Sequence, residues 1–506
     1  MKRNDLLTHP NQARTTSVVL FLVATVVFLY LRTFLLPHTP LAARDDGLVF
    51  FEHAKRILLG EVPFRDFFIF VMPGTDLLYA GIFRVFGIHA WLAQAILIVI
   101  GSALTGVILW ISQSVLRGPI VFLPALLFLV LDFNSALDAT HHWYNTLLVM
   151  TAAGVLMGGR SLRRILIAGF LCGIATLFTQ TQGTLSLIAI AIYLVCADRE
   201  EIPTGLPAQL TCLIVPFLVI VGGVLGYYIH MAGFHSLLYA LWYYPFLVVI
   251  AEHTYPLRAY NYMIPPHHTL GDLIRMVPFI FIRLLVPLIY LACLLRLFFE
   301  RARIERRTWD SLLLINLIGL ALFTAIVSGP SFHRACMIAP PAVIVCVWFF
   351  SGATPIDRAV RGALWLMSIG FFFYLPVRQQ FASRTYLDLP TGRTAFLSPD
   401  HPEVYQWFAQ QTHAGDSFFN LTQASFPLAL RNPTPIDIVY PAANTPPEQV
   451  DAVVRSLETH PTQFVFLPNF RMPPGTRDNL QAFHEYVYSH YHLAKTFPIG
   501  AFWELN

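Results

Sequence analysis

Two adjacent carboxylates, Asp45 and Asp46, follow the first apolar segment of the chain. Such a pair can take a proton from an acceptor hydroxyl, hold a divalent cation, or simply be solvated in a loop. Two touching carboxylates also perturb each other's ionisation, so they titrate as a pair. Taken alone, the pair favours the solvated loop, and its meaning depends on the segments around it.

Basic side chains beside other apolar segments suit the binding of an anionic group. His333 and Arg334 stand at the start of an apolar run, within the sequence SGPSFHRA, and Arg258 lies in a long polar segment. An arginine can donate two parallel hydrogen bonds to a phosphate. The alternative for Arg334 is an anchor that reaches the lipid headgroups.

A polar cluster, DFNSALDATHHWYN, contains the adjacent histidines His141 and His142. A histidine pair with an aspartate could bind zinc, but successive helical residues point about 100° apart, so adjacent rings do not readily share one ion. The cluster is therefore interpreted as a polar lining of a substrate site. Its Trp143 would stack on a sugar ring or belong to the aromatic belt of the membrane interface.

The chain that carries these residues is strongly apolar. Of its 506 residues, 56% are hydrophobic and 12% are charged, whereas soluble domains carry about 25% charged residues. This composition excludes a soluble multidomain protein. The net charge of +4 is spread along loops, so it does not indicate a nucleic-acid partner. All six cysteines fall in apolar segments, which gives no sign of a disulfide framework.

Apolar runs recur through residues 16–377 and predict an α-helical polytopic membrane protein with about 11 transmembrane helices. The first run leads into Pro37 without a small-residue cleavage pattern, so we interpret it as a retained helix and not as a signal peptide. The predicted spans are 16–36, 90–114, 119–132, 144–158, 165–179, 184–197, 208–230, 277–299, 310–328, 335–351 and 363–377.

Arginines collect in alternate loops, and this bias predicts the orientation. With a cytoplasmic N-terminus, the loops that contain Arg117, Arg160, residues 301–307 and Arg358 are cytoplasmic too. An odd number of spans then places the C-terminus outside. We expect a multi-pass protein of the cell inner (plasma) membrane with its C-terminal domain extracytoplasmic.

Residues 37–89 form a long first outer loop between the first two predicted spans. Its segment GLVFFEHAKRILLG, from Gly47 to Gly60, has apolar residues at helical spacing with charged residues elsewhere. This pattern is typical of a helix lying along the membrane interface. A second short helix is expected after Pro73-Gly74, running to Phe86.

The composition changes near residue 378, which divides the chain into a transmembrane catalytic domain, 1–377, and a C-terminal domain, 378–506. Frequent prolines in the second part exclude long apolar helices. We expect amphipathic helices at 401–412 and 447–460 and an apolar strand at 464–468. A helix followed by a strand indicates a small α/β domain outside the membrane.

The stretch 43–87 resembles the first outer loop of bacterial GT-C glycosyltransferases of the protein mannosyltransferase and aminoarabinose transferase type. In that family an acidic pair after the first helix leads into a conserved run, which is matched here by Ala54, Leu58, Gly60, Pro63, Phe64, Arg65, Asp66, Phe67, Pro73, Gly74, Leu78 and Tyr79. Phe64 replaces the usual tyrosine, and Asp46 replaces the commoner glutamate. The resemblance extends weakly to GPSFHRACMIAPP at 329–341 and RNPTP at 431–435.

The resemblance implies a GT-C fold and a polyprenyl-phosphate sugar donor used on the extracytoplasmic face. The acceptor would be a lipid, a glycan or a protein. Asp45 matches the catalytic aspartate of the family and would take the acceptor proton, while Asp46 would share a cation or steady the sugar. Asp66 matches a second acidic position, although a charge near a helix start explains it equally well.

The predicted site divides into two groups of residues. The acidic group that does the chemistry is Asp45, Asp46 and Asp66, and the substrate-binding group is His333, Arg334, Arg258, His141 and His142. No cofactor is required by the sequence, and a divalent cation could be held by Asp45 and Asp46.

Two other classes of function fit parts of the sequence. A secondary transporter should carry charges near its span centres, but here the charges lie mainly at the span ends. A component of a lipid-linked glycan polymerase or flippase is the other alternative, with the C-terminal domain as a binding module. The sequence has no phosphate loop, dinucleotide fingerprint or CxxC spacing, which disfavours an ATP-driven pump.

Overall fold

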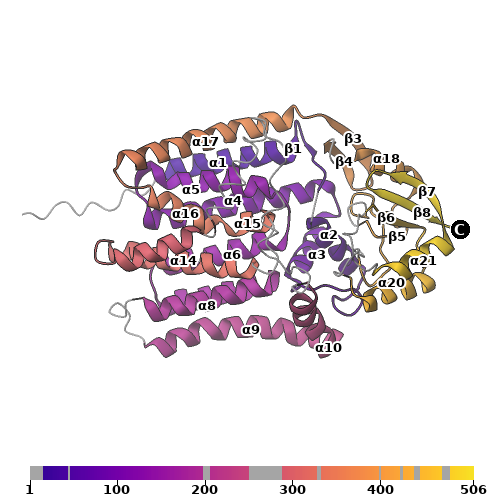
Figure 1. The fold of residues 1–506 in the computed structure, drawn as a ribbon, viewed down its shortest axis with the longest axis horizontal. Coiled ribbons are helices and arrows are strands. Elements are labelled where there is room, and N and C mark those ends of the chain that lie inside the picture. Colours follow the sequence, from indigo (N-terminus) through magenta and orange to yellow (C-terminus); the bar gives the residue numbers. More distant parts are fainter. Residues whose placement is uncertain are drawn as a thin grey trace, which may run out of the picture.

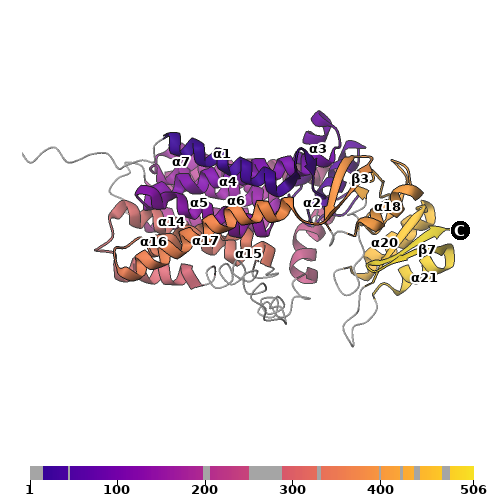
Figure 2. The same cartoon turned by 90° about the horizontal axis from the view of Figure 1, so that it is seen from above.

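The computed structural model describes residues 15–43, 46–197, 205–249, 286, 288–326, 332–397, 401–421, 425–437, 445–469 and 479–506. A bundle of long helices occupies one end of the molecule, and a sheet with its own helices occupies the other (Figures 1 and 2). The helices α2 (Gly47–Leu58) and α3 (Gly74–Phe86) lie between these two parts.

The bundle is built from apolar helices that run side by side. Its elements are α1 (Thr15–Thr33), α4 (Ala90–Val115), η1 (Gly118–Val121), α5 (Phe122–Leu127), η2 (Phe128–Phe133), α6 (His141–Met157), α7 (Leu162–Phe178), α8 (Gln180–Cys196), α9 (Leu206–Ala232), α14 (Arg306–Ile326), α15 (Phe332–Ile338), α16 (Pro340–Phe349) and α17 (Pro355–Gln380). Close crossings use glycine. A Cβ at Gly169 of α7 would collide with the backbone of Leu213 in α9, so the missing side chain lets these two helices touch.

Within the described residues, five helices are long and apolar enough to cross a membrane, namely α1, α4, α9, α14 and α17. The pair α15 and α16 forms a sixth, broken span with a bend of 64°. Pro340 and Pro341 begin α16, and proline cannot continue the preceding helix, which accounts for the break. The protein is therefore an integral membrane protein, and the count of eleven spans stays a prediction.

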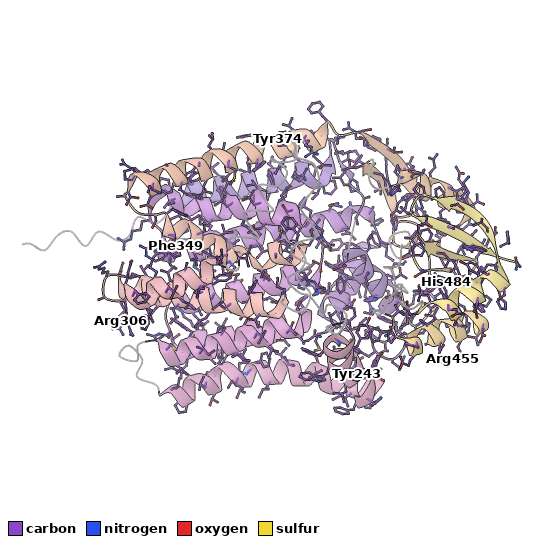
Figure 3. The ribbon with its side chains drawn as sticks, viewed as in Figure 1. Tyr243, Arg306, Phe349, Tyr374, Arg455 and His484 are labelled. Carbon is purple, nitrogen blue, oxygen red and sulfur yellow. The ribbon has the colours of Figure 1, made fainter. Side chains whose placement is uncertain are left out.

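The arginine-rich loops lie together at one end of the bundle. Arg117 pairs with Glu305 at 3.1 Å, and Arg160 with Asp310 at 3.9 Å, which joins three of the loops that the arginine bias assigns to one side. Arg306 marks this end in Figure 3, opposite the C-terminal part where Arg455 and His484 lie. The grouping agrees with the predicted alternation of loops, although which end faces the cytoplasm stays a prediction.

Helix α2 begins and ends close to its predicted bounds, but its surroundings differ from those expected. An interfacial helix should leave its charged side chains in water, whereas Glu52, His53, Lys55 and Arg56 are all buried. The reason is that segment 425–437 covers the polar face of α2 and supplies partners for its charges. The polar face of α2 is therefore covered by protein and not by water, while its position along the membrane interface stays a prediction.

The C-terminal part contains a hairpin and a four-stranded mixed sheet. The hairpin pairs β3 (Arg384–Leu389) with β4 (Gly392–Leu397). The sheet has the order β5-β6-β8-β7, in which β5 (Phe418–Phe419) and β6 (Phe464–Pro468) are parallel and the other pairs are antiparallel. Its remaining elements are β7 (Tyr491–Phe497), β8 (Gly500–Leu505), α18 (Pro402–Gln411), α20 (Pro447–Thr459) and α21 (Gln481–His490).

Short elements connect the two parts of the molecule. A small hairpin of β1 (Phe34–Leu35) and β2 (Thr39–Pro40) follows α1, and a backbone hydrogen bond of 2.9 Å from Ala42 to Ala395 joins the first outer loop to β4. On the other side, α9 leads into α10 (Phe234–Leu238) and the π-helical segment η4 (Tyr239–Val249). The predicted domain boundary at 377/378 falls inside α17, which continues to Gln380.

Candidate active site

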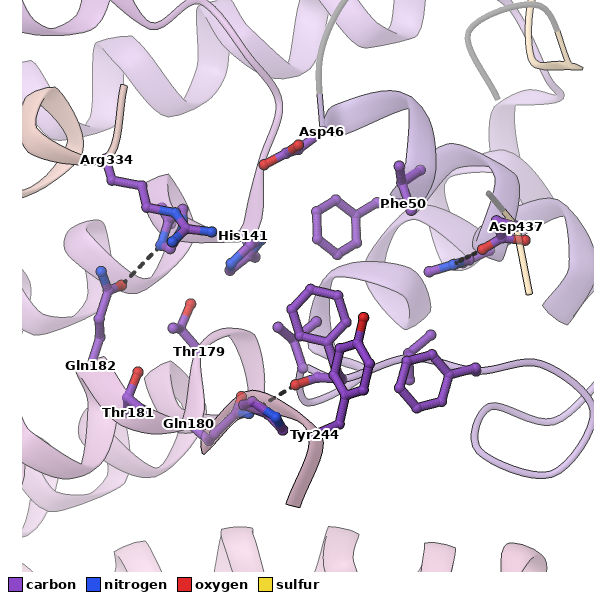
Figure 4. Close-up of a pocket in the computed structure, with 18 of the residues that line it drawn as sticks. Asp46, Phe50, His141, Thr179, Gln180, Thr181, Gln182, Tyr244, Arg334 and Asp437 are labelled. Carbon is purple, nitrogen blue, oxygen red and sulfur yellow. Dashed lines mark hydrogen bonds and ion pairs between the residues drawn. The ribbon is translucent and has the colours of Figure 1, made fainter. Parts of the chain in front are cut away.

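A cavity of about 330 Å³ lies where the bundle, the first outer loop and the C-terminal part meet (Figure 4). Its walls come from α2, segment 68–71, the starts of α6 and α8, η4, α15 and the residues Ile436, Asp437, Thr445 and Gln449. These segments come from loops and helix ends that the sequence assigns to one side of the membrane. The fold therefore gathers the chemically promising residues at one place.

One end of the cavity combines a cation with polar groups that lack protein partners. Arg334 of α15 lies beside His141 and His142, whose ring centroids are 4.0 Å apart (Figure 4). His142 uses Nδ1 to contact Gln182 Oε1 at 3.4 Å. Among the described residues, His142 Nε2, Gln182 Nε2 and Thr179 Oγ1 are buried and make no hydrogen bond. Unmade hydrogen bonds of buried groups are costly, so this end is built to receive polar atoms of a ligand.

Helix starts explain why these side chains converge. α6 begins at His141 and α8 begins at Gln180, and neither helix start is capped by a side chain. The first N–H groups of a helix and its dipole favour negative charge. An anion at this end would thus meet Arg334 together with two helix N-termini.

Asp46 reaches the same cavity from the start of α2. Asp138 holds this start in place, because its carboxylate accepts hydrogen bonds from the backbone N–H groups of Asp46 at 3.1 Å and Gly47 at 2.8 Å. Glycine permits this approach, since a Cβ at Gly47 would come 2.7 Å from Asp138 Oδ1. Asp46 also interacts electrostatically with Arg334 across the cavity. Asp45 lies outside the described residues.

The opposite end of the cavity holds a buried imidazole between two carboxylates. His53 Nδ1 contacts Asp76 Oδ1 at 2.7 Å, and His53 Nε2 contacts Asp437 Oδ2 at 2.5 Å. Burial alone would lower the pKa of His53, but the two carboxylates raise it to about 10. His53 is therefore an imidazolium at neutral pH that donates from both nitrogens.

Asp437 accepts hydrogen bonds from three side chains. Besides His53 it accepts hydrogen bonds from Arg56 Nη1 at 3.1 Å and from Asn432 Nδ2 at 3.2 Å. Burial acts to raise the pKa of Asp437, yet His53 and Arg56 hold it below its usual range. In this buried network the charges satisfy one another, so they fix α2 to the segment around Asp437.

Lys55 makes a second link to the same segment. Its Nζ donates to Glu52 Oε2 at 2.7 Å and to the carbonyl oxygens of Ser425 and Leu430 at 3.2 and 2.6 Å. Ser425 Oγ in turn donates to Glu52 Oε2 at 2.6 Å. Four residues of α2, Glu52, His53, Lys55 and Arg56, therefore contact residues that lie far away in the sequence.

The structure brings together some of the predicted site residues and separates others. Asp46, His141, His142 and Arg334 line the cavity. His333 is exposed and does not line it, because it occupies a different face of α15 from Arg334. Arg258, like Asp45, lies outside the described residues.

Asp66 also lies away from the cavity lining. It forms an ion pair with Arg65 at 2.7 Å and accepts a hydrogen bond of 2.7 Å from the backbone N–H of Val62. The hydrogen bond from Arg65 lowers the pKa of Asp66. These contacts close a turn within the first outer loop, and the turn keeps the carboxylate away from Asp46.

A metal centre does not emerge from the described residues, in which no three His, Cys, Asp or Glu side chains gather as ligands. The contact of the two histidine rings brings no carboxylate ligand with it. A divalent cation at the acidic pair stays a prediction, because only Asp46 of that pair is described.

Several residues that line the cavity were not identified as candidate site residues from the sequence. Thr179 and Gln182 belong to a short polar interruption between two apolar runs, and that interruption was the available signal. His53 sits in a helical pattern typical of a solvated face, and Asp437 follows the RNPTP stretch by two residues. Their pairing spans 384 positions of the chain, and no local pattern indicates it.

Comparison with known proteins reveals similarity in structure but not in sequence. No protein-family model and no characterised protein match the sequence. The structure of ArnT from Cupriavidus metallidurans bound to undecaprenyl phosphate matches with a TM-score of 0.58 and 13% identity, over 97% of this chain and 98% of that one. Its apo form gives 0.57 and 12% over the same shares.

A more distant structure is the apo oligosaccharyltransferase of Archaeoglobus fulgidus, with a TM-score of 0.49 and 10% identity, over 90% of this chain and 70% of that one. At these identities a match establishes the fold alone. The match to ArnT covers both the helix bundle and the C-terminal sheet. The chain therefore has the fold of the GT-C membrane glycosyltransferases.

Proposed function

We propose that this protein is a glycosyltransferase that moves a sugar from a polyprenyl-phosphate donor to a hydroxyl of an acceptor. The reaction would take place on the extracytoplasmic face of the membrane. The observation that carries the proposal is the end of the cavity at Arg334, where buried His142, Gln182 and Thr179 have polar atoms without partners in the described structure. A phosphate ester supplies the negative charge and the oxygen atoms that these groups lack.

The donor class is supported by the fold. ArnT of Cupriavidus metallidurans has the same architecture over nearly its whole length and was solved with undecaprenyl phosphate. In the present chain, Arg334 would bind the phosphate, and Gln182 and Thr179 would hold its oxygens. His142 Nε2 can donate to a phosphate oxygen in the tautomer that carries its proton on Nε2, so binding of the anion would favour that tautomer.

The acidic pair supplies the base in this mechanism. Asp45, by its resemblance to the family motif, removes the proton of the acceptor hydroxyl, and Asp46 faces Arg334 across the cavity. The acceptor oxygen then forms a bond to the anomeric carbon of the sugar while the bond from that carbon to the phosphate oxygen breaks. The bonding electrons leave with the polyprenyl phosphate, whose charge Arg334 stabilises.

The test is release of polyprenyl phosphate by the purified protein. The protein in lipid nanodiscs is incubated with undecaprenyl phosphates that carry different sugars, together with lipid, glycan and peptide acceptors. Release that depends on both the donor and an acceptor supports the proposal. Absence of release from every donor, in a preparation that binds undecaprenyl phosphate, would reject transferase activity and favour a flippase component.

A further inference from the structure

The end of the cavity remote from Arg334 has a chemistry of its own. Aromatic rings form one side of it, since the Phe68 and Tyr244 rings meet at 4.8 Å between centroids with an interplanar angle of 73°. Phe70 extends this surface, with its ring centroid 5.4 Å from that of Tyr244. All three rings line the cavity, and Figure 4 shows Tyr244 between the Arg334 end and Asp437.

The C-terminal part supplies a polar group that faces these rings. Gln449 lies in the first turn of α20 and lines the cavity, and the residue is only 7% exposed. Its Nε2 makes no hydrogen bond within the described residues. The Gln449 side chain also hydrogen-bonds with Tyr239, and Tyr239 packs in turn on Phe68 and Tyr244, which places Gln449 at the aromatic surface.

The wall beside this amide is hydrogen-bonded to the first outer loop. Asp437 is fixed by His53 and Arg56, and the backbone N–H of Phe68 donates to the carbonyl oxygen of Pro435 at 2.8 Å. The aromatic surface and segment 435–437 are thus parts of one bonded unit. A preformed wall costs little ordering entropy when a ligand binds.

The charges at this end exclude two classes of ligand. Asp437 would repel a phosphate, and its own charge is already balanced by His53 and Arg56, so it offers little to a cation. A hydrocarbon chain would leave the Gln449 amide without a partner, which is costly when buried. The fitting ligand is neutral and has both a C–H face and oxygen acceptors.

We infer that this end of the cavity, formed by Phe68, Tyr244 and Gln449, is a subsite for a sugar ring. The polarised C–H groups of a pyranose or furanose pack on the negative faces of aromatic rings, and its oxygens accept from the amide of Gln449. The ring belongs either to the donor or to a glycan acceptor. The inference deepens the proposed function and rests on it for the choice between these two sources.

The test uses soluble sugars, so it does not depend on a lipid donor. Saturation-transfer NMR measures the binding of methyl mannopyranoside, methyl glucopyranoside and methyl arabinopyranoside to the full chain in nanodiscs. Gln449→Leu removes the amide and should weaken the binding of the preferred glycoside about fivefold, the loss expected for one hydrogen bond. Gln410→Leu is the matched control, because Gln410 is an exposed helical glutamine of the same C-terminal part.

A second variant keeps the test decisive if Gln449→Leu does not fold. Phe68→Leu keeps an apolar side chain but removes the aromatic face, and it should weaken the same glycoside to a similar degree. The inference fails if no methyl glycoside gives a saturation signal with the wild type, or if neither variant differs from Gln410→Leu. It also fails if undecaprenyl phosphate alone displaces the glycoside, since the ring would then occupy the Arg334 end.

Displacement by sugar-charged carriers identifies the source of the ring. If an undecaprenyl phosphate that carries a sugar displaces the glycoside and the sugar-free carrier does not, the subsite holds the donor sugar. If the sugar-carrying undecaprenyl phosphate binds without displacing the glycoside, the subsite holds the acceptor ring. If no sugar-carrying undecaprenyl phosphate ever loses its sugar, the proposed function fails. The comparison of Gln449→Leu with its control still decides whether the sugar subsite exists.

Discussion

Two clusters of polar side chains at the cavity, the ion pairs around Asp437 and the side chains beside Arg334, use buried polar groups in opposite ways. Around Asp437 the cations and carboxylates satisfy each other, whereas around Arg334 buried atoms of His142, Gln182 and Thr179 have no hydrogen bond in the described structure. An unmade buried hydrogen bond costs about 1 to 3 kcal/mol. The comparison teaches that the share of buried polar atoms with hydrogen-bond partners, more than the number of charges, distinguishes a binding site from a network that stabilises the fold.

The largest expected effect is the loss of the base. Asp45→Asn keeps the shape of the side chain but removes the proton acceptor, so turnover should fall by at least about 10²-fold while donor binding persists. Single-turnover release of polyprenyl phosphate measures the change. Near-normal turnover would move the assignment to Asp46, and loss of donor binding would indicate that the pair holds a cation.

Breaking the ion pairs around Asp437 should affect stability more than binding. Asp437→Asn leaves the buried charges of His53 and Arg56 without their shared partner, a loss of about 3 to 5 kcal/mol for a buried pair. Thermal unfolding in detergent measures it, with the exposed Asp451→Asn of α20 as control. Equal stability of the two variants would show that the network is not a brace.

The same network predicts a dependence of stability on pH. Because the pKa of His53 is raised from 6.5 to about 10 in the folded state, its contribution is complete below pH 6.5 and is lost as the pH rises towards 10. His53→Gln should flatten this alkaline decline in the unfolding temperature. An identical decline in wild type and variant would assign the effect to other groups.

Changing Arg334, beside the buried polar atoms without partners, should affect ligand binding more than stability. Arg334→Ala removes hydrogen bonds to a charged group, so undecaprenyl phosphate should bind about tenfold or more weakly, with little change in the unfolding temperature. Arg378→Ala, an exposed arginine of α17, is the control for general loss of positive charge. Unchanged binding in Arg334→Ala would place the phosphate elsewhere.

The smallest expected effect is at Asp66. Its ion pair with Arg65 is partly exposed, with 32% and 46% of the two side chains accessible, and such pairs contribute about 0 to 1 kcal/mol. Asp66→Asn should therefore leave turnover within about twofold of the wild type. A loss comparable to that of Asp45→Asn would return Asp66 to the catalytic group.

Periodicity in the sequence predicted the positions of most described elements. The expected helix at 447–460 is α20, and the expected strand at 464–468 is β6. Runs of apolar residues define such elements locally, so their ends are readable. The π-helical turn η2 and the break before Pro340 were not predicted, because both change the hydrogen bonding of a run that stays apolar.

The candidate site was less accessible from the sequence. Arg334 and the two histidines were singled out because charged and imidazole side chains are rare beside apolar runs. Gln449 was not, since it is one polar residue of an amphipathic helix whose pattern is typical of a solvated face. Only the packing of α20 against segment 239–244 turns it towards the cavity.

The buried charges of α2 have a consequence for how the protein can be divided. A chain cut after α17 would retain Lys55, Arg56 and His53 but lose Ser425, Leu430 and Asp437, the partners that make their burial tolerable. The helical part alone should then expose or refold its first outer loop, and the C-terminal part alone would carry an unbalanced buried carboxylate. Neither piece is a portable module, so exchange of C-terminal parts between relatives would require α2 to be exchanged with them.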